Sequence, residues 1–126
     1  PEDELKEDPY FEIKPRYWVD KKEVENRLSE RWDKNWLLGF RDICRSTDER
    51  TAIFSLLPKT ATGNHIIIIN NTRDAKLISC LLANFCSLTF DFATRHKVGG
   101  THMNFFIVKQ LPVIPPERYT EKDIEY

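Results

Sequence analysis

Polar and basic side chains that could bind a polyanion gather in three stretches between apolar runs of this chain. The stretches are residues 44–50, 58–65 and 95–104, and each combines basic groups with hydroxyl, amide or imidazole groups. Arg, Lys, Asn and His suit phosphates and the edges of bases, while hydroxyls suit phosphate oxygens. The candidate contact residues are Arg41, Arg45, Ser46, Thr47, Arg50, Lys59, Thr60, His65, Arg95, Lys97, Thr101 and His102.

Each candidate also has a purely structural alternative. Arg45 and Arg50 flank a tight turn and could pair with its acids, Asp48 and Glu49. The threonines of the second stretch could simply form a turn, and His96 in the third could cap the C-terminal end of a helix. The residue types alone therefore leave both interpretations open.

No group of residues has the types and spacing of a catalytic or metal site. Cys44, Cys80 and Cys86 contain no CxxC pair and stand at no metal-ligand spacing from a histidine. A cysteine nucleophile near a histidine is possible in space, but the last two thiols fall in an apolar run typical of inert core residues. Asp91 precedes Arg95 by four residues, which favours an ion pair on a helix. We predict no catalytic residue, cofactor site or metal ligand in this chain.

Apolar runs predict a small, largely antiparallel or mixed sheet. Its three strands are residues 36–43, 51–58 and 64–70, and the isoleucines of the last run suggest burial on both faces. A further short strand is predicted at residues 15–19. After the paired glycines, residues 103–114 predict a strand, a tight turn and a final extended segment.

Two helices are predicted beside this sheet. Asp20 can cap a surface helix that places Val24, Leu28 and Trp32 on one face. Asp74 can cap one long core helix that runs to about residue 94. The apolar stripe of that helix comprises Leu77, Ile78, Leu81, Leu82, Phe85, Leu88 and Phe92. The predicted fold class is α+β, with the sheet packed on one long apolar helix plus a surface helix.

The length of 126 residues and a hydrophobic content of 40% predict one globular domain with its own core. Residues 1–15 are polar and punctuated by prolines, which predicts a tether. The domain itself is expected to span residues 16–118. Residues 119–126 are predicted to form an acidic tail.

The formal net charge of −1 conceals a basic middle of the chain. Residues 31–110 hold 11 basic and 6 acidic residues. Such a local excess can serve a polyanion, although it is also compatible with an ordinary solvated surface. No apolar run is long enough to span a bilayer, and the odd number of cysteines argues against a disulfide framework. These features predict a cytoplasmic protein without a membrane partner.

An ordered set of segments resembles a known family. The segments are FRDICRSTDERTAIFSLLP, then GN before a hydrophobic strand, and then LLANFCSLTFDFATRHKVGGTHMNFFIVKQLPVIPP. They are similar to the target-recognition domain that follows the catalytic domain in adenine-specific DNA methyltransferases, including fused restriction-modification and phage-defence enzymes. The final glycine loop, Asn and LPVIPP also resemble the end of recognition domains in type I restriction specificity subunits. The resemblance covers roughly residues 16–118.

The resemblance implies a domain that reads the sequence of double-stranded DNA. A covalently linked or associated methyltransferase domain would flip out and methylate the adenine, and S-adenosylmethionine would bind there. In this picture Gly99 and Gly100 let the backbone turn sharply and bring residues 101–104 back against the sheet. Asn104 is expected to pin that strand, since a buried amide needs hydrogen-bond partners.

Two functions of different class therefore remain. The first is DNA target recognition, in which Arg45 and Arg50 read bases because arginine can form a bidentate pair with guanine. Lys59 and Lys97 would then suit phosphates, since lysine is a point charge on a flexible stem. The second is a protein-interaction or regulatory module whose basic middle binds an acidic partner through exposed aromatic residues.

Overall fold

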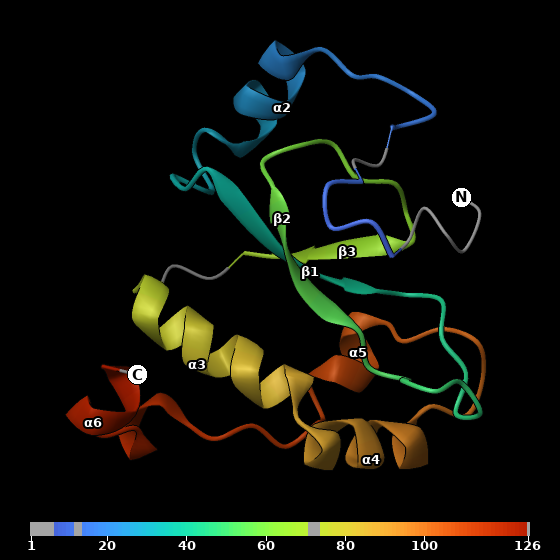
Figure 1. Cartoon of the computed structure of the whole chain (residues 1–126), viewed down its shortest axis with the longest axis vertical. Helices are drawn as coiled ribbons and strands as arrows, with labels where there is room; N and C mark the ends of the chain where they lie inside the picture. The colour runs from blue at the N-terminus through green and yellow to red at the C-terminus, as the bar shows by residue number, and fades with distance from the viewer. Residues whose placement is uncertain (1–6, 12–13, 71–73, 126) are drawn as a thin grey trace.

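The computed structural model describes residues 7–11, 14–70 and 74–125. Along the chain it contains α2 (Lys21–Leu28), β1 (Trp36–Arg41), β2 (Phe54–Pro58), β3 (Ile66–Ile69), α3 (Ala75–Cys86), α4 (Leu88–Lys97), α5 (Phe105–Val108), the 3-10 helix η1 (Pro116–Arg118) and α6 (Glu121–Ile124). Figure 1 shows a twisted central sheet with α3, α4 and α5 toward one side and α2 at the far end. The fold is α+β, as the sequence predicted.

The sheet has three antiparallel strands in the order β2–β1–β3, with β1 at its centre. Trp36 at the start of β1 lies opposite Pro58 at the end of β2. Arg41 at the end of β1 lies opposite Ile66 at the start of β3. Since both neighbours run antiparallel to β1, the connection 59–65 must travel from one end of the sheet to the other. The three predicted strands and their antiparallel pairing are confirmed.

The core lies between the sheet and the helices, and aromatic rings connect its layers. Leu38 and Phe40, which share one face of β1, are buried, and Leu37 on the opposite face is buried as well. The ring of Phe40 stacks on Phe54 of β2 at a centroid distance of 5.2 Å. Phe54 stacks in turn on Phe85 of α3 at 4.2 Å. Phe90 of α4 meets Phe85 edge-on at 5.1 Å.

The predicted single core helix is wrong, because Ser87 divides it into α3 and α4. The Ser87 N–H ends α3 by donating to the Asn84 carbonyl oxygen, and its hydroxyl accepts a hydrogen bond from the Phe90 N–H at 3.1 Å. The two helices meet at an angle of 63°. Leu88 and Phe92, which the predicted stripe placed in the core, are 76% and 64% exposed. The bend turns their face of α4 away from the sheet.

Near the N-terminus the predicted surface helix is present, whereas the predicted short strand is not. The tether predicted at residues 1–15 lies partly outside the described residues, and its described residues form no helix or strand. Residues 15–19 form no strand, and Trp18 there is 83% exposed. The surface helix is present, but it ends at Leu28. Trp32, the last residue of its predicted apolar face, is buried after the helix has ended.

Predictions near the C-terminus also need correction. The strand expected within residues 103–114 is absent, and α5 occupies its place. Asn104 starts this helix, since its side-chain oxygen accepts a hydrogen bond from the Ile107 N–H at 3.1 Å. Asn104 therefore does pin the chain, although as an exposed helix cap and not as a buried amide. The acidic tail predicted at residues 119–126 contains α6, which a capping box at Thr120 begins.

Candidate functional site

Two of the three polar stretches meet at the end of the sheet where β1 finishes. An isolated antiparallel bridge joins Ile43 to His102. Next to it, the Cys44 N–H donates to the Thr101 carbonyl oxygen at 3.0 Å. The chain after the glycines thus pairs with the chain after β1; the resemblance implied a return of residues 101–104 to the sheet but not this partner. This pairing places the turn at residues 44–50 beside Thr101 and His102.

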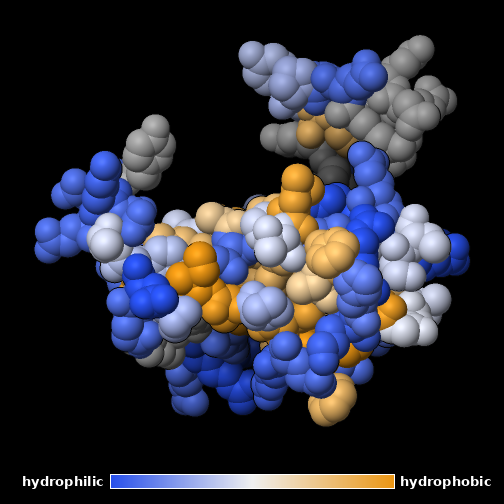
Figure 2. Space-filling view, turned by 90° about the horizontal axis from the view of Figure 1, so that it is seen from below, coloured by the Kyte–Doolittle hydropathy of each residue, from blue (hydrophilic) through white to orange (hydrophobic). Residues whose placement is uncertain are grey.

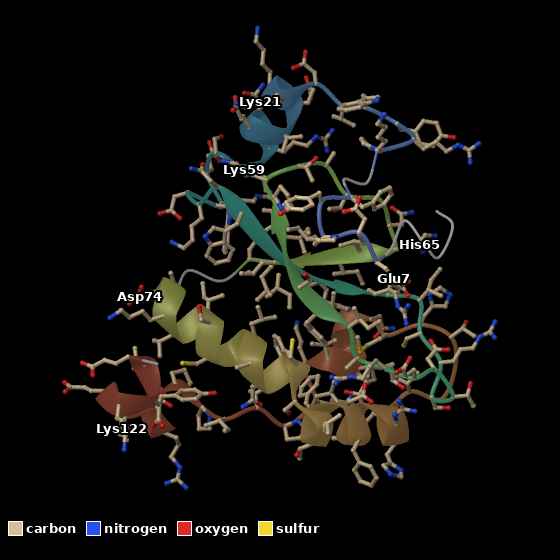
Figure 3. All side chains as sticks on the ribbon, viewed as in Figure 1. Glu7, Lys21, Lys59, His65, Asp74 and Lys122 are labelled. Carbon is tan, nitrogen blue, oxygen red and sulfur yellow. The ribbon has the colours of Figure 1, made fainter. Side chains whose placement is uncertain are left out.

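The remaining stretch, residues 58–65, is divided between the two ends of the sheet. The His65 carbonyl oxygen accepts a hydrogen bond from the Asp42 N–H at 2.9 Å, so His65 belongs to the same end as His102. The Lys59 N–H instead donates to Asn35, which precedes β1 at the opposite end. Figure 3 shows Lys59 close to α2 and His65 at the start of β3. The structure therefore does not bring Lys59, or Thr60 beside it, to the other candidates.

A buried carboxylate ties the turn to α4. Asp91 is only 4% exposed, and its Oδ1 atom accepts hydrogen bonds from the N–H groups of Thr51 at 2.8 Å and Ala52 at 2.7 Å. Its Oδ2 atom accepts one from Arg95 Nε at 2.9 Å. Arg50 Nε lies 3.6 Å from Oδ1 and adds a second positive charge. The predicted pair between Asp91 and Arg95 is confirmed.

These contacts keep Asp91 ionised. Burial by itself would raise the pKa of Asp91, but the hydrogen bond from the Ala52 N–H opposes it. The hydrogen bond and charge of Arg95 and the charge of Arg50 act in the same sense. The pKa of Asp91 therefore lies below its ordinary value. A carboxylate held as an anion by four partners is a structural anchor and not a proton carrier.

The same network engages two arginines that were predicted to contact DNA. Arg95 donates to the Ser46 carbonyl oxygen at 2.9 Å and also to the Glu49 carbonyl oxygen. Arg50 donates to the Cys86 carbonyl oxygen at 2.9 Å, at the C-terminal end of α3. Both guanidinium groups thus hold backbone carbonyl oxygens of the fold. The i, i+4 spacing predicted Asp91 as a partner of Arg95, but no local signal in the sequence linked Arg50 to Cys86 of α3 or to Asp91 of α4.

The acids of the turn have other partners than predicted. Asp48 Oδ2 lies 3.2 Å from the guanidinium of Arg41 and also accepts a hydrogen bond from the Arg45 backbone N–H at 3.1 Å. The Arg45 carbonyl oxygen accepts one from the Thr51 hydroxyl at 3.0 Å. The backbone of Arg45 is therefore held on both sides. Its side chain is exposed, and no described residue forms a hydrogen bond or ion pair with its guanidinium.

One contact between side chains at this end of the sheet was not predicted. His102 Nδ1 lies 2.6 Å from Asp42 Oδ2. The side chain of Asp42 is 14% exposed and that of His102 is 58% exposed. Asp42 follows β1 directly and His102 follows the glycines, so only the bridge between the two segments brings them together. No periodicity or motif in the sequence could have revealed this contact.

The chain does return after the paired glycines, as the resemblance implied. Neither Gly99 nor Gly100 has a positive φ, however, and a Cβ atom on either would meet nothing within 4 Å. This turn therefore does not require glycine at either position. Lys97, just before them, is exposed, and its Nζ lies 3.5 Å from the side-chain oxygen of Gln110. That long contact leaves the Lys97 ammonium accessible to solvent.

No three His, Cys, Asp or Glu side chains in the described part of the chain lie close enough together to hold a metal ion. The three cysteines are free thiols. Cys44 is buried, whereas Cys86, expected in the core, is exposed.

No described helix is by itself long and apolar enough to cross a membrane, and only α3 and α4 together, across their bend, reach that length and composition. No protein-family model, curated protein or solved structure matches the chain.

Proposed function

We propose that this chain is a DNA sequence-recognition domain of an adenine-specific DNA methyltransferase or restriction-modification enzyme. It would hold target duplex DNA for a separate, linked or associated methyltransferase domain, which would bind S-adenosylmethionine and carry out the chemistry. The observation that supports this best is the meeting of two polar stretches at one end of the sheet. We call their exposed side chains the loop surface, and it comprises Arg45, Ser46, Thr47, Thr101 and His102.

The loop surface combines exposed side chains with a backbone that is firmly held. Asp91 and Arg95 hold the turn at residues 44–50, and the bridge between Ile43 and His102 holds the stretch at residues 95–104. Binding to such a surface requires little further ordering of the backbone, which favours affinity. Its donors and acceptors match those of base edges and phosphate oxygens.

The arginines have distinct roles in this proposal. Arg45 is the candidate for a bidentate contact with guanine, because its guanidinium is exposed on a fixed turn. Arg50 and Arg95 support the turn from within the fold. Lys97 is the candidate phosphate contact, since it carries an exposed ammonium at the end of α4, in the same polar stretch as His102.

Equilibrium binding to a random-sequence duplex over a series of salt concentrations tests the proposal. We expect the affinity to fall steeply with salt, and we expect Lys97→Ala to lower the slope of log K against log salt by about 1. Lys122→Ala is the matched control, because Lys122 lies in α6, well away from the sheet end that carries His65 (Figure 3). An affinity independent of salt, or no binding, would count against the proposal.

A protein-interaction module is the second candidate, and the apolar surface of the helices favours it. Leu88 and Phe92 on α4 and Phe106 on α5 are largely exposed. Figure 2 shows apolar atoms gathered across the middle of the face that is seen from below. Exposed apolar patches on a folded protein often mark protein contacts. Binding of polyglutamate as tight as that of duplex DNA, combined with weakening by Phe92→Ser, would favour this candidate over the first.

A further inference from the structure

We propose that Asp42 orients the ring of His102 so that its Nε2 atom accepts a hydrogen bond from an exocyclic amino group of a DNA base. The donor would be adenine N6 or cytosine N4 in the major groove. This inference rests on the proposed function, and it assigns Asp42 as the positioning residue and His102 as a specificity-determining residue.

The geometry of the pair gives each residue a distinct position. The 2.6 Å distance between His102 Nδ1 and Asp42 Oδ2 is that of a short, charge-assisted hydrogen bond. The carboxylate is largely covered, with 14% of the Asp42 side chain exposed, whereas 58% of the His102 side chain is exposed. The carboxylate thus lies inside the surface and the imidazole lies on it.

The backbone holds both partners in place. The Asp42 N–H donates to the His65 carbonyl oxygen at 2.9 Å, and the Asp42 carbonyl oxygen accepts from the Met103 N–H at 2.7 Å. His102 itself forms the bridge with Ile43. The contact is therefore fixed by pairing of main chains on both sides of Asp42, unlike an ion pair between two mobile surface side chains.

This arrangement selects one tautomer of the imidazole. An ionised carboxylate can only accept hydrogen bonds, so Nδ1 must carry the proton that is shared with Asp42. In the neutral ring, Nε2 then has a lone pair and acts as an acceptor. The same carboxylate–histidine relation fixes the ring of histidines that bind metals. Nε2 of His102 is consequently the acceptor that the pair offers.

The nearby charges favour an amino group over a phosphate as the ligand of Nε2. The negative charge of Asp42 lies directly behind the ring. The neighbouring Arg41 cannot cancel that charge fully, because its guanidinium pairs with Asp48 at 3.2 Å. A phosphate would be repelled by this carboxylate, whereas an amino group carries a partial positive charge and would be attracted.

Only two bases can provide such a donor in the major groove. Adenine presents N6–H and cytosine presents N4–H, while guanine O6 and N7 and thymine O4 are acceptors there. An unprotonated Nε2 would therefore prefer adenine or cytosine at one position of the recognised site. The expected discrimination is about 5- to 150-fold, the usual range for a specific base contact.

The tautomer can be tested without DNA. A long-range nitrogen–proton correlation spectrum of the free protein near neutral pH should show the proton of His102 on Nδ1. Asp42→Asn should give a mixture of both tautomers, because an amide can either accept from or donate to the ring. A proton found on Nε2 alone in the wild-type protein would overturn the inference.

Selection of bound duplexes from a pool with a randomised core tests the base contact. We expect the wild-type protein to prefer adenine or cytosine at one position, and the selected base shows which of the two is read. Asp42→Asn should reduce that preference by about 5-fold or more and leave the other positions unchanged. His102→Lys, which replaces an acceptor by a donor, should shift the preference at the same position to guanine.

Two contrary results are distinguishable from each other. Uniform loss of affinity for all sequences in Asp42→Asn, with a lower salt slope, would place a doubly protonated ring on phosphate and overturn the inference alone. Absence of DNA binding by the wild-type protein would overturn the proposed function as well. If Asp42→Asn does not fold, as judged by its thermal unfolding, the result for His102→Lys decides, and an unshifted preference there overturns the inference.

Discussion

Arg95 and Asp91 lie one turn apart on α4, with Nε 2.9 Å from Oδ2, and together they hold the turn that carries Arg45. Asp91 binds the backbone where the turn ends, and Arg95 binds carbonyl oxygens within it. The candidate recognition surface thus depends on a pair that does not itself belong to that surface. Loss of this pair should lower the free energy of unfolding, and any effect on binding should follow from that loss of stability.

Asp91→Ala should lower the free energy of unfolding by about 3–5 kcal/mol, because it leaves Arg95 and the buried N–H groups of Thr51 and Ala52 without their acceptor. Asp91→Asn should cost less, about 1–3 kcal/mol, since one amide oxygen can still accept from both N–H groups. Urea unfolding followed by circular dichroism measures both. Asp74→Asn is the control, because Asp74 stands at the N-cap of α3 without a capping hydrogen bond from its side chain. Equal stability of Asp91→Ala and wild type would contradict the anchoring role.

The stability of the protein should fall in acid, and Asp91 should account for part of that fall. Its pKa in the folded protein lies below the ordinary value of 3.8. The stabilisation is therefore complete above that ordinary value and is lost as the pH falls through the lower pKa of the folded state. Asp123, whose pKa is also lowered, is unchanged in Asp91→Asn, so the difference between the two proteins isolates Asp91.

The quantity to measure is the difference in unfolding free energy between the wild type and Asp91→Asn in the acid range. The unfolding free energy of the wild type should decrease more steeply than that of Asp91→Asn below about pH 4. Urea unfolding at a series of pH values gives both curves. Parallel curves throughout the acid range would show that Asp91 has the same pKa in the folded and unfolded chains.

Phe85→Ala should destabilise the protein by about 3–5 kcal/mol, because the buried ring stacks on Phe54 and contacts Phe90. Leu81→Ala should cost less, since Leu81 is only partly buried against the core. Leu88→Ala is the matched control, because its side chain is mostly exposed beyond the bend. Thermal unfolding ranks the three variants. A loss of stability for Leu88→Ala as large as that for Phe85→Ala would mean that Leu88 lies in the core, as a single continuous core helix would require.

Arg45→Ala and Arg50→Ala should have separable effects, although the sequence suggested the same role for both. Arg45→Ala should keep wild-type stability and relax the preference for one base pair, worth about 1–3 kcal/mol. Arg50→Ala should lower the free energy of unfolding by about 1–3 kcal/mol, because it removes a hydrogen bond to Cys86 and a charge beside Asp91. Duplex selection and urea unfolding separate the two. A changed base preference in Arg50→Ala at full stability would mean that Arg50 leaves Asp91 to contact DNA.

Local patterns were sufficient to predict the three strands of the sheet and one ion pair on a helix, although the same rules also predicted strands at residues 15–19 and after Met103 that the structure lacks. The alternating and continuous apolar runs around residues 36–43, 51–58 and 64–70 predicted β1, β2 and β3, since a strand depends on contiguous residues of suitable shape and polarity. The pair of Asp91 and Arg95 was equally predictable, because a helix brings residues four apart together. Both features require no knowledge of the rest of the fold.

The bend at Ser87 could not be predicted with the same rules. Leu88 and Phe92 continue the helical spacing of the α3 stripe, so periodicity reports one helix whether or not the axis bends. Which side of α4 is buried depends on its packing against β2 and α3: Phe90 is buried against Phe54 and Phe85, whereas Phe92 is exposed. Ser87 is a local signal for the start of a new helix, but only packing decides whether the helix ends there or continues along the apolar stripe.

The sequence by itself determined which residue types could bind DNA, and the tertiary structure decided which of them are free to do so. Arg45 and Arg50 stand in the same turn, yet only Arg50 meets a carboxylate from α4. Asp42 acquires a possible role only because the chain after the glycines returns and places His102 beside it. An ion pair requires two side chains within a few ångströms, and between segments far apart in the chain that distance is set by the packing of the sheet and helices, which no local pattern encodes.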